Sequence, residues 1–345
     1  MKVLFYSYPQ AFQNPGGGEV MLLKTKEALE KQGVYVKLFN QWEDKIKDYD
    51  ILHIFGSVKD CLGLMESAKS FGIKIVVSPI FWSTFQKCFF EYGSIVDRLR
   101  LTAQHLAKVI MPNIPSQRRK IFLLADAIIA NSFMERDQVK RLFSIDNKKI
   151  AVAHLGVDER FISANPQEFI DKFGIKDFIL SVGRIEPRKN NLNLIKALKS
   201  SGLKLVIIGD PVSNYMQYYE ECKRQADKNT IFINRIDHED ALLASAYAAS
   251  SVFVLQGWFE TPGLVALEAG LSGARLAVTN GGSTKEYFND CAEYFNPACQ
   301  KSIRKTIFKA LKKEKTNTFK NRIKANYSWD NSAKKTLEVY EHLLK

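Results

Sequence analysis

The sequence predicts an α/β fold built from two Rossmann-like, doubly wound domains. Short runs of apolar residues alternate with segments of helical periodicity, which indicates parallel strands connected by helices. This alternation stops near residue 161 and starts again near residue 178. A chain of 345 residues is also long enough to give each of two domains a full core.

The first half opens with an apolar run that ends before Pro9, as expected of a buried parallel strand. A loop containing Gly16–Gly18 follows, and the next helical segment stops at Gly33. The strands are predicted at 2–8, 34–39, 51–55, 73–78, 127–130 and within 148–158. The helices are predicted at 20–32, 61–71 and 132–143, and residues 82–125 are expected to be mainly helical.

The second half follows residues 161–173, which are polar around Pro166 and are predicted to form a linker. Its strands are predicted at 178–182, 204–208, 231–233, 252–255 and 274–278. Its helices are predicted at 190–199, 302–313 and 331–344, with further helices between the last three of these strands. We therefore expect an N-terminal domain at 1–162, a C-terminal domain at 163–325, and a helix at 326–345 that packs back toward the N-terminal domain. The two domains are expected to face each other across a cleft, where ligands commonly bind.

The net charge of +13 is the one unusual feature of the composition. The charge is concentrated in two stretches. The first contains Arg98, Arg100, Lys108, Arg118, Arg119 and Lys120, and the second contains Lys301, Arg304, Lys305, Lys309, Lys312, Lys313 and Lys315. Such patches can bind anionic lipid or nucleic acid, and a solvated basic helix face is the alternative, which we favour for the second stretch considered alone. Because no nucleic-acid-binding motif accompanies the charge, nucleic acid is not expected as a partner.

The five cysteines are scattered and form no CxxC pair, so neither a disulfide framework nor a zinc site is predicted. The N-terminal run is typical of a strand and not of a signal peptide. No apolar stretch approaches the roughly 18 residues that would cross a bilayer. We therefore expect a cytoplasmic protein, with peripheral contact to the inner face of a membrane where the basic patches meet anionic lipid.

Two carboxylates, Glu260 and Glu268, stand out in the stretch WFETPGLVALEAGLSG, with seven residues between them. Pro262 suits the first turn of the helix that should follow. Leu264, Leu267 and Leu271 form an apolar stripe on that helix, and Glu268 lies at its edge. An inward-facing carboxylate is costly unless its charge or its acceptor oxygens are needed. A salt-bridged residue at the edge of the stripe is the alternative explanation.

A second candidate is the segment SVGRIEPRKN, in which Arg184 follows a strand and Lys189 begins a helix. Two cations at a strand-to-helix turn after Gly183 suit a diphosphate, and a pair of exposed basic residues is the alternative. In the first half, backbone N–H groups of Gly17 and Gly18 could approach an anion, although a plain turn is as good an explanation. The GxGxxG and P-loop patterns are both missing.

The histidines are less informative. His53 ends a strand, where it could line a cleft or pack in the core, and His154 is expected to be structural. His105, His238 and His342 have no recognisable partner pattern. The acidic pair of DYD, Asp48 and Asp50, has the spacing of some metal sites but is expected to lie in a loop without metal.

Taken in order, several motifs resemble those of a known family. They are the Gly-rich loop after the first strand, ADAIIANS, HLGVD, VGR followed by KN, Glu–seven residues–Glu, GGSTKE and the terminal YSWDNSAKKTLEVYEHLL. The chain is similar to retaining glycosyltransferases of family 4, whose two-domain fold is called GT-B. The resemblance extends over nearly the whole length.

The resemblance implies a metal-independent enzyme without a cofactor, whose donor substrate is a nucleotide-diphosphate sugar. Arg184 and Lys189 would neutralise the diphosphate, Glu260 would face the donor sugar, and Glu268 would accept hydrogen bonds from the ribose hydroxyls. The central prediction is that these four side chains bind the donor. Three of them, Glu260, Arg184 and Lys189, form the predicted catalytic set. The remaining donor-binding positions are Gly17, Gly18, Gly183, Pro262, Gly263 and Leu264.

The resemblance also suggests a saccharide or lipid-linked acceptor in surface polysaccharide synthesis, bound on the N-terminal domain near Phe81 and Trp82. Here the chain departs from many relatives, because VVSPIFW has no histidine and its aromatic residues would form an apolar wall suited to a deoxy sugar. The loop sequence ETPG also replaces the commoner EGFG. A sugar phosphorylase and a non-catalytic nucleotide-sugar-binding protein are the alternative functions.

Overall fold

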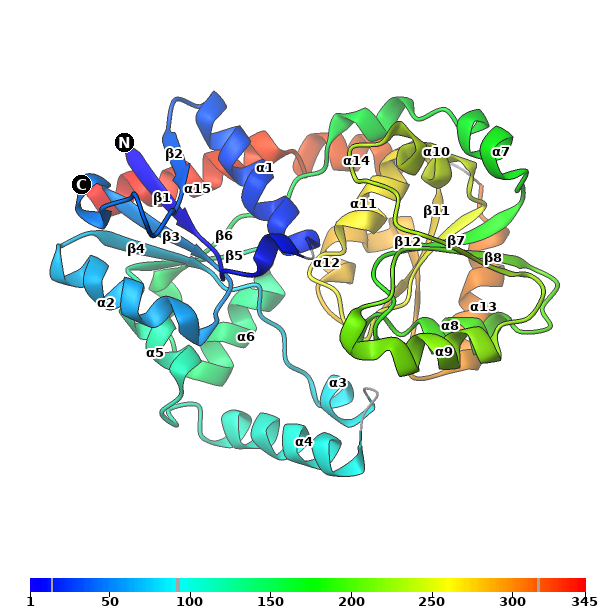
Figure 1. Cartoon of the computed structure of the whole chain (residues 1–345), viewed down its shortest axis with the longest axis horizontal. Helices are drawn as coiled ribbons and strands as arrows, with labels where there is room; N and C mark the ends of the chain where they lie inside the picture. The colour runs from blue at the N-terminus through cyan, green and yellow to red at the C-terminus, as the bar shows by residue number, and fades with distance from the viewer. Residues whose placement is uncertain (14, 91–93, 315–316) are drawn as a thin grey trace. The chain divides into compact units, whose positions relative to one another are not determined.

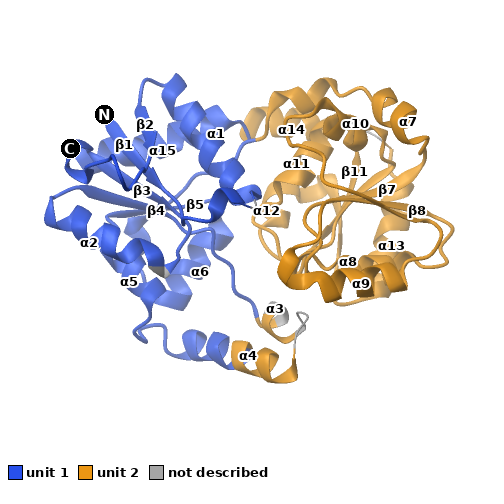
Figure 2. Cartoon of the chain, viewed as in Figure 1, with its two compact units in different colours: residues 1–84, 102–156, 327–345 blue, residues 85–101, 157–326 orange. Residues whose placement is uncertain are grey.

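The computed structural model describes residues 1–13, 15–90, 94–314 and 317–345. The chain divides into two compact units, shown in Figure 2. Unit 1 contains residues 1–84, 102–156 and 327–345, and unit 2 contains residues 85–101 and 157–326. Lys315 of the second basic stretch lies outside the described residues.

Unit 1 is built on a six-stranded sheet in the order β2-β1-β3-β4-β5-β6, and all its paired strands are parallel (Figure 1). Its strands are β1 (Lys2–Tyr6), β2 (Tyr35–Leu38), β3 (Ile51–Phe55), β4 (Lys74–Ser78), β5 (Ala127–Ala130) and β6 (Ile150–Val152). The central strand β3 is buried along its whole length. This explains its near-continuous apolar sequence, since both faces of a parallel sheet are covered by helices.

Helices cover both faces of this sheet. One layer contains α1 (Gly17–Lys31) and α15 (Trp329–Leu344), which pack on each other. The other layer contains α2 (Leu62–Ser70), α5 (Gln117–Leu124) and α6 (Phe133–Phe143). The core beneath this second layer includes Met65, Phe122 and Phe143, each no more than 1% exposed. The helices α3 (Phe85–Phe90) and α4 (Ile95–Ile110) lie between β4 and α5 in the chain.

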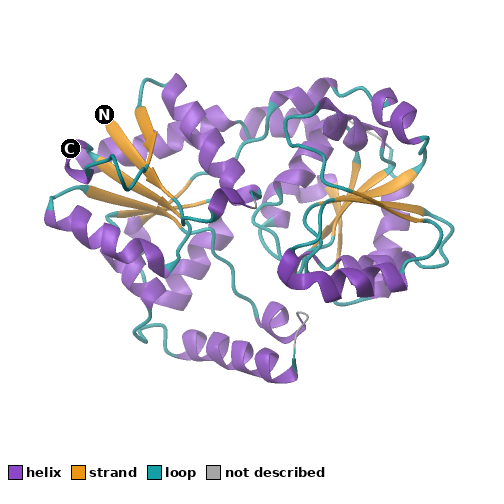
Figure 3. Ribbon diagram, viewed as in Figure 1, coloured by secondary structure: helices purple, strands orange, loops and turns teal. Residues whose placement is uncertain are grey.

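Unit 2 repeats the architecture with the strand order β12-β11-β10-β7-β8-β9, again with parallel pairs. Figure 3 shows its strands with helices around them. Its strands are β7 (Phe178–Val182), β8 (Lys204–Ile208), β9 (Thr230–Ile233), β10 (Val252–Leu255), β11 (Arg275–Thr279) and β12 (Ala292–Phe295). Its helices are α7 (Gln167–Phe173), α8 (Asn191–Leu198), α9 (Met216–Gln225), α10 (Ala241–Ala249), α11 (Leu264–Leu271), α12 (Thr284–Phe288), α13 (Gln300–Leu311) and α14 (Thr318–Asn326). The predicted α/β class with two doubly wound, Rossmann-like units is thereby confirmed.

The predicted linker at 161–173 is wrong. Residues Glu159–Ser163 form a 3-10 turn and Gln167–Phe173 form α7. Phe161 and Phe169 are fully buried, and the Phe161 ring packs against His238 and Tyr247. This packing also explains why unit 2 begins at Val157 and not at the predicted residue 163. The prediction also omitted β12, α12 and α14.

His53 is a core residue of unit 1. Its Nδ1 lies 2.5 Å from the Tyr340 hydroxyl and its Nε2 lies 2.9 Å from the Ser78 hydroxyl. Burial lowers the pKa of His53 to about 3, so the ring is neutral at physiological pH. Of the two explanations for this histidine, core packing therefore applies, and the bond to Tyr340 connects β3 to α15.

Candidate functional site

The order of the strands points to one position in unit 2. After β7 the chain forms β8 and β9, which lie on one side of β7 in the sheet. It then forms β10, which lies on the other side of β7. Ligands of open parallel sheets bind where the connections diverge in this way, beyond the carboxyl ends of the two strands. A pocket lies at this position, lined by the ends of β7 and β10 and by Arg184, Lys189 and Glu260. The structure thus brings together the three residues predicted as the catalytic set.

The loop after β7 contains two residues with positive φ angles, Gly183 and Asn190. Gly183 has φ +143°, which a residue with a side chain rarely adopts. Lys189 ends a short 3-10 turn, and Asn190 follows it in the left-handed conformation. The buried Asn190 amide donates to the carbonyl oxygens of Gln256 and Pro297, at 3.1 and 2.9 Å. These bonds fix the turn that carries Lys189 against the loop after β10.

Lys189 and Glu260 form a close ion pair, with 2.7 Å between Nζ and Oε1. The side chains are 19% and 6% exposed, so little solvent reaches the pair. Burial lowers the pKa of Lys189, and the carboxylate of Glu260 opposes that shift. The more exposed Arg184 guanidinium lies 3.7 Å from Glu186, whose carboxylate also accepts a 2.9 Å bond from Arg188.

The segment Gly281–Ser283 holds the backbone of Glu260. The Glu260 N–H donates to the Gly281 carbonyl at 3.2 Å, and the Ser283 N–H donates to the Glu260 carbonyl at 3.0 Å. A Cβ on Gly282, which has φ +96°, would overlap the Glu260 carbonyl oxygen. The GGST sequence after β11 therefore has a direct structural reason, because only glycine permits this approach of two backbones.

Replacing Gly282 by alanine should displace Glu260 and destabilise unit 2 by at least about 2 kcal/mol. Gly273→Ala is the matched control, because Gly273 has a similar φ of +90° and a Cβ there would meet only the flexible end of Lys320. We expect Gly273→Ala to cost about 1 kcal/mol, the strain of the backbone alone. Denaturant unfolding of both variants measures the difference, and equal losses would contradict the proposed contact.

Pro262 was predicted to lie in the first turn of the helix after Glu260, and this is wrong. The helix α11 begins at Leu264, and Gly263, with φ +89°, precedes it in the left-handed conformation. Thr261 and Pro262 therefore belong to the loop that connects Glu260 to the helix. The first N–H groups of α11 remain at its N-terminus, which carries a partial positive charge.

Glu268 lies on α11 and is 4% exposed. Its Oε1 is 2.8 Å from Nε2 of His238, and its Oε2 accepts a 2.9 Å bond from the Tyr247 hydroxyl. Glu268 is thus a buried, doubly hydrogen-bonded carboxylate that forms an ion pair with His238 when that ring is protonated, and it does not reach solvent as a snorkelling residue would.

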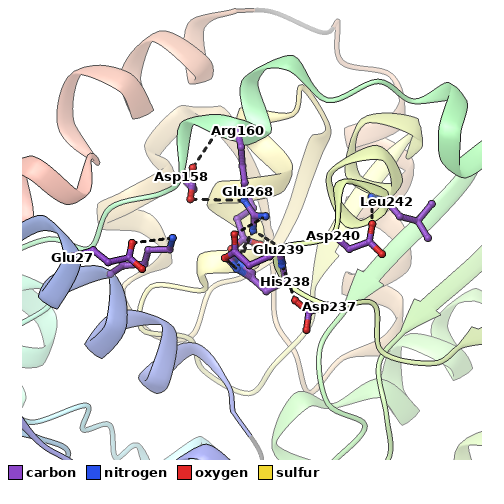
Figure 4. A network of polar contacts seen from close by, with 10 residues as sticks. Glu27, Asp158, Arg160, Asp237, His238, Glu239, Asp240, Leu242 and Glu268 are labelled. Atoms are coloured by element: carbon purple, nitrogen blue, oxygen red, sulfur yellow. Dashed lines mark hydrogen bonds and ion pairs between the residues drawn. The ribbon is translucent and has the colours of Figure 1, made fainter. Parts of the chain in front are cut away.

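His238 is the site residue that the sequence did not reveal. It belongs to the connection between β9 and α10, and Figure 4 shows it beside Glu268, Glu239 and Arg160. Burial disfavours protonation of the ring, but the hydrogen bond and charge of Glu268 outweigh this and raise the pKa of His238. The proximity of Glu268 could not be inferred from sequence spacing, because 30 positions separate the two residues.

The predicted residues of unit 1 have different environments. Gly17 and Gly18 are the first residues of α1 and not part of a loop, and Glu19 accepts a 2.7 Å bond from the Gly16 N–H. Phe81 is 5% exposed and packs on Phe143 in the core. Trp82 is 8% exposed. Neither aromatic side chain forms an open wall on unit 1, because both are buried.

The remaining polar candidates have local roles. Asp50 accepts a 2.7 Å bond from the Lys2 N–H at the start of β1. His105 Nδ1 lies 2.9 Å from the Ser83 hydroxyl, and His154 packs edge-on against Phe133 and Tyr327. Across the described ranges, the side chains that commonly bind metals form no group suited to a metal ion.

Comparison with known proteins gives the site a context. Residues 166–329 match the family model described as glycosyl transferases group 1. An uncharacterized glycosyltransferase of Methanocaldococcus jannaschii is 27% identical over 235 residues, which cover 62% of this chain and 59% of that protein. A serotype-specific mannosyltransferase of Escherichia coli is 29% identical over 246 residues, covering 65% of this chain and 30% of that protein. The chain thus spans less than two thirds of the first relative and less than one third of the second.

Two solved structures have the same fold over nearly the whole chain. Sucrose-phosphate synthase of Thermosynechococcus elongatus has a TM-score of 0.79 at 15% identity and covers 99% of this chain and 98% of its own. Anabaena HepE, solved with UDP and glucose, has a TM-score of 0.73 at 17% identity and covers 99% of this chain and 100% of its own. Residues 166–329 are therefore similar to the glycosyl transferases group 1 family, within a chain whose two Rossmann-like units have the GT-B fold.

Proposed function

We propose that this protein is a retaining, metal-independent glycosyltransferase that moves a hexose from a nucleotide-diphosphate sugar to a saccharide or lipid-linked acceptor. The observation that carries the proposal is the Lys189–Glu260 pair beside Arg184, at the switch point of a sheet in the part of the chain that matches the glycosyl transferases group 1 model. Solved relatives of the fold include HepE with UDP-glucose, which supports a nucleotide-sugar donor. An E. coli mannosyltransferase of the O-antigen chain is also similar, which supports a role in surface polysaccharide synthesis.

In this proposal the cations act on the leaving nucleotide diphosphate. Transfer breaks the bond between the sugar and the distal phosphate, so negative charge grows on a phosphate oxygen. Lys189 contributes a charge in a poorly solvated site, where electrostatic stabilisation is strongest, and Arg184 can bind two phosphate oxygens. The N-terminus of α11 adds a partial positive charge. These groups would do the work of a divalent cation, which is why we propose a metal-independent reaction.

The two carboxylates have different proposed roles. Glu260 is held by backbone bonds to Gly281 and Ser283 and would contact the donor sugar, with Lys189 as its partner before the donor binds. Glu268, buried on α11, would accept hydrogen bonds from the ribose. The remaining donor contacts within unit 2 would come from Gly183 and from the backbone of Gly263 and Leu264.

The experiment that tests the function is a thermal-shift screen against UDP, GDP, ADP and their hexose conjugates, because a ligand that binds only the folded state raises its stability. We expect one nucleotide family to raise the unfolding temperature and its sugar conjugate to support transfer in the presence of EDTA. NMR of the product should show the anomeric configuration of the donor. Stabilisation by none of these ligands would refute the proposal, and a requirement for metal would refute its metal-independent part.

We also propose that α4 holds the enzyme at an anionic membrane surface, where a lipid-linked acceptor would be found. Ile95, Leu99, Leu106 and Ile110 share one face of α4 and are 43–75% exposed. Arg98 and Arg100 flank this face, and each such residue contributes about 1 kcal/mol to binding at an anionic surface. The Arg100 guanidinium lies 3.4 Å from Asp97, but both side chains are more than half exposed. The second basic stretch is less suitable, because Lys309 and Lys313 lie 2.6 and 2.7 Å from Glu293. No described helix is long and apolar enough to cross a membrane.

Leu99→Glu should abolish binding to vesicles of phosphatidylglycerol and phosphatidylcholine, because it places a charge in the apolar face of α4. Gln104→Glu is the matched control, since it adds the same charge to an exposed position of α4 away from that face. Vesicle sedimentation measures both variants. Equal binding of the two variants would contradict the role of the apolar face.

A further inference from the structure

The Glu268 carboxylate is fixed by two donors from different parts of unit 2. His238 comes from the connection after β9 and lies 2.8 Å from Oε1, and Tyr247 comes from α10 and lies 2.9 Å from Oε2. Each carboxylate oxygen can accept two hydrogen bonds. Among the described residues, each oxygen thus accepts one of these two bonds, which leaves one acceptor position on each oxygen. This arrangement holds the carboxylate so that both oxygens can accept from a pair of neighbouring hydroxyls.

The surroundings of His238 determine which ring nitrogen carries the proton. Nη2 of Arg160 lies 3.0 Å from Nδ1, and a guanidinium can only donate. Oε1 of Glu239 lies 3.1 Å from the same Nδ1 and can only accept while ionised. In the neutral ring, Nδ1 accepts from Arg160 and the proton is on Nε2. In the charged ring, Nδ1–H donates to Glu239 and Nε2 is again protonated. In both states Nε2–H donates to Glu268.

Arg160 is itself held in place. It donates to the backbone carbonyl of His238, its Nη1 lies 3.2 Å from Glu239, and its guanidinium stacks over the Phe161 ring at 4.6 Å. Figure 4 shows Arg160 close to the group formed by Glu268, Glu239 and His238, with Asp158 beside the arginine. Nη2 of Arg160 lies 3.0 Å from Nδ1 and 3.5 Å from Nε2 of His238, so the guanidinium restrains the imidazole beside Glu268.

We propose that His238 is a positioning residue that orients Glu268 to receive the two vicinal hydroxyls of the ribose of the donor nucleotide. This inference rests on the proposed function, which makes Glu268 the ribose ligand. His238 would not touch the reacting atoms. Its effect would appear in nucleotide affinity and in KM for the donor, with kcat little changed, and it would be specific to nucleotides that carry both hydroxyls.

The test compares His238→Leu with His238→Gln, because the glutamine amide can place an N–H near the position of the imidazole Nε2 and leucine cannot. His342→Leu controls for the loss of an exposed histidine on α15. Calorimetry would measure the dissociation constants of UDP, GDP and ADP and of their 2′-deoxy forms. The 2′-deoxy forms report whether each variant retains a folded phosphate and base site.

We expect the wild type to bind one ribonucleotide at least tenfold more tightly than its 2′-deoxy form. His238→Leu should lose about tenfold in affinity for the ribonucleotide, the worth of one strong hydrogen bond, and little for the 2′-deoxy form. His238→Gln should restore most of the preference. If His238→Leu keeps the wild-type preference for the ribonucleotide over its 2′-deoxy form, because the affinities for both are unchanged or fall equally, the inference is overturned. If the wild type binds none of the three diphosphates, the proposed function is refuted, and the inference with it.

Discussion

Replacing Lys189 by alanine should lower kcat/KM for sugar transfer by about 100-fold or more, which is the usual effect of removing one preorganised group that stabilises charge in a transition state. Lys189 is the cation that the structure holds 2.7 Å from Glu260, in the pocket at the ends of β7 and β10. Its removal also leaves Glu260, 5% exposed, without its ion-pair partner. A buried charge that loses its partner is costly, so we expect a fall in stability of about 3 kcal/mol.

The matched control for Lys189→Ala is Arg188→Ala. Arg188 is the preceding residue on the same 3-10 turn, but its guanidinium pairs with Glu186. Both variants lose one positive charge from the same loop. A difference in kcat/KM between them therefore reports the position of the lost side chain and not the change in net charge. Steady-state kinetics with saturating acceptor measure the effect, and urea unfolding measures the stability. Comparable transfer by both variants would show that Lys189 does not act on the leaving group.

Replacing Glu268 by alanine should abolish the stabilisation by nucleotide that we expect of the wild type. The change removes the proposed acceptor for the ribose and also leaves the His238 and Tyr247 donors without a partner in a buried place. Unpaired buried donors cost about 1–3 kcal/mol, so the variant should also unfold at a lower temperature in the absence of nucleotide. Glu268→Gln keeps the shape and one acceptor oxygen, and we expect an intermediate loss of affinity.

The control for Glu268→Ala is Glu239→Gln. Glu239 also contacts His238, but its side chain is 64% exposed and it lies on the opposite side of the imidazole. Thermal unfolding with and without the nucleotide separates the two effects, because the difference between the two curves reports binding alone. If Glu268→Ala retained the full nucleotide-induced shift, the assignment of Glu268 to the donor would be wrong.

The central strands were the most predictable part of the molecule. The predicted ranges 51–55, 127–130, 178–182, 204–208 and 252–255 coincide with β3, β5, β7, β8 and β10. Parallel strands covered on both faces consist almost entirely of apolar residues, so their limits are visible in the sequence. The positions of Arg184 and Lys189 were predictable for a related reason, since the end of β7 fixes where its loop begins.

The errors have a common cause. Phe161 and Phe169 were assigned to a linker because their neighbours in the chain are polar, yet both are buried against residues that are distant in sequence. Pro262 was placed in a helix because proline is common in the first turn, but the helix begins only at Leu264, after Gly263. The local sequence pattern gives the secondary-structure preference of a segment, and packing against segments that are distant in sequence can override this preference.

The sequence by itself determined the α/β class, the two repeated units, and the candidates Glu260, Glu268, Arg184 and Lys189. Only the tertiary structure decided which of these groups meet. It paired Lys189 with Glu260 and placed His238 and Tyr247 on the two oxygens of Glu268. The physical reason is that chain spacing specifies neighbours within a strand or a helix. Contacts between side chains from different loops depend on the order of the strands, which brings β7 beside β10.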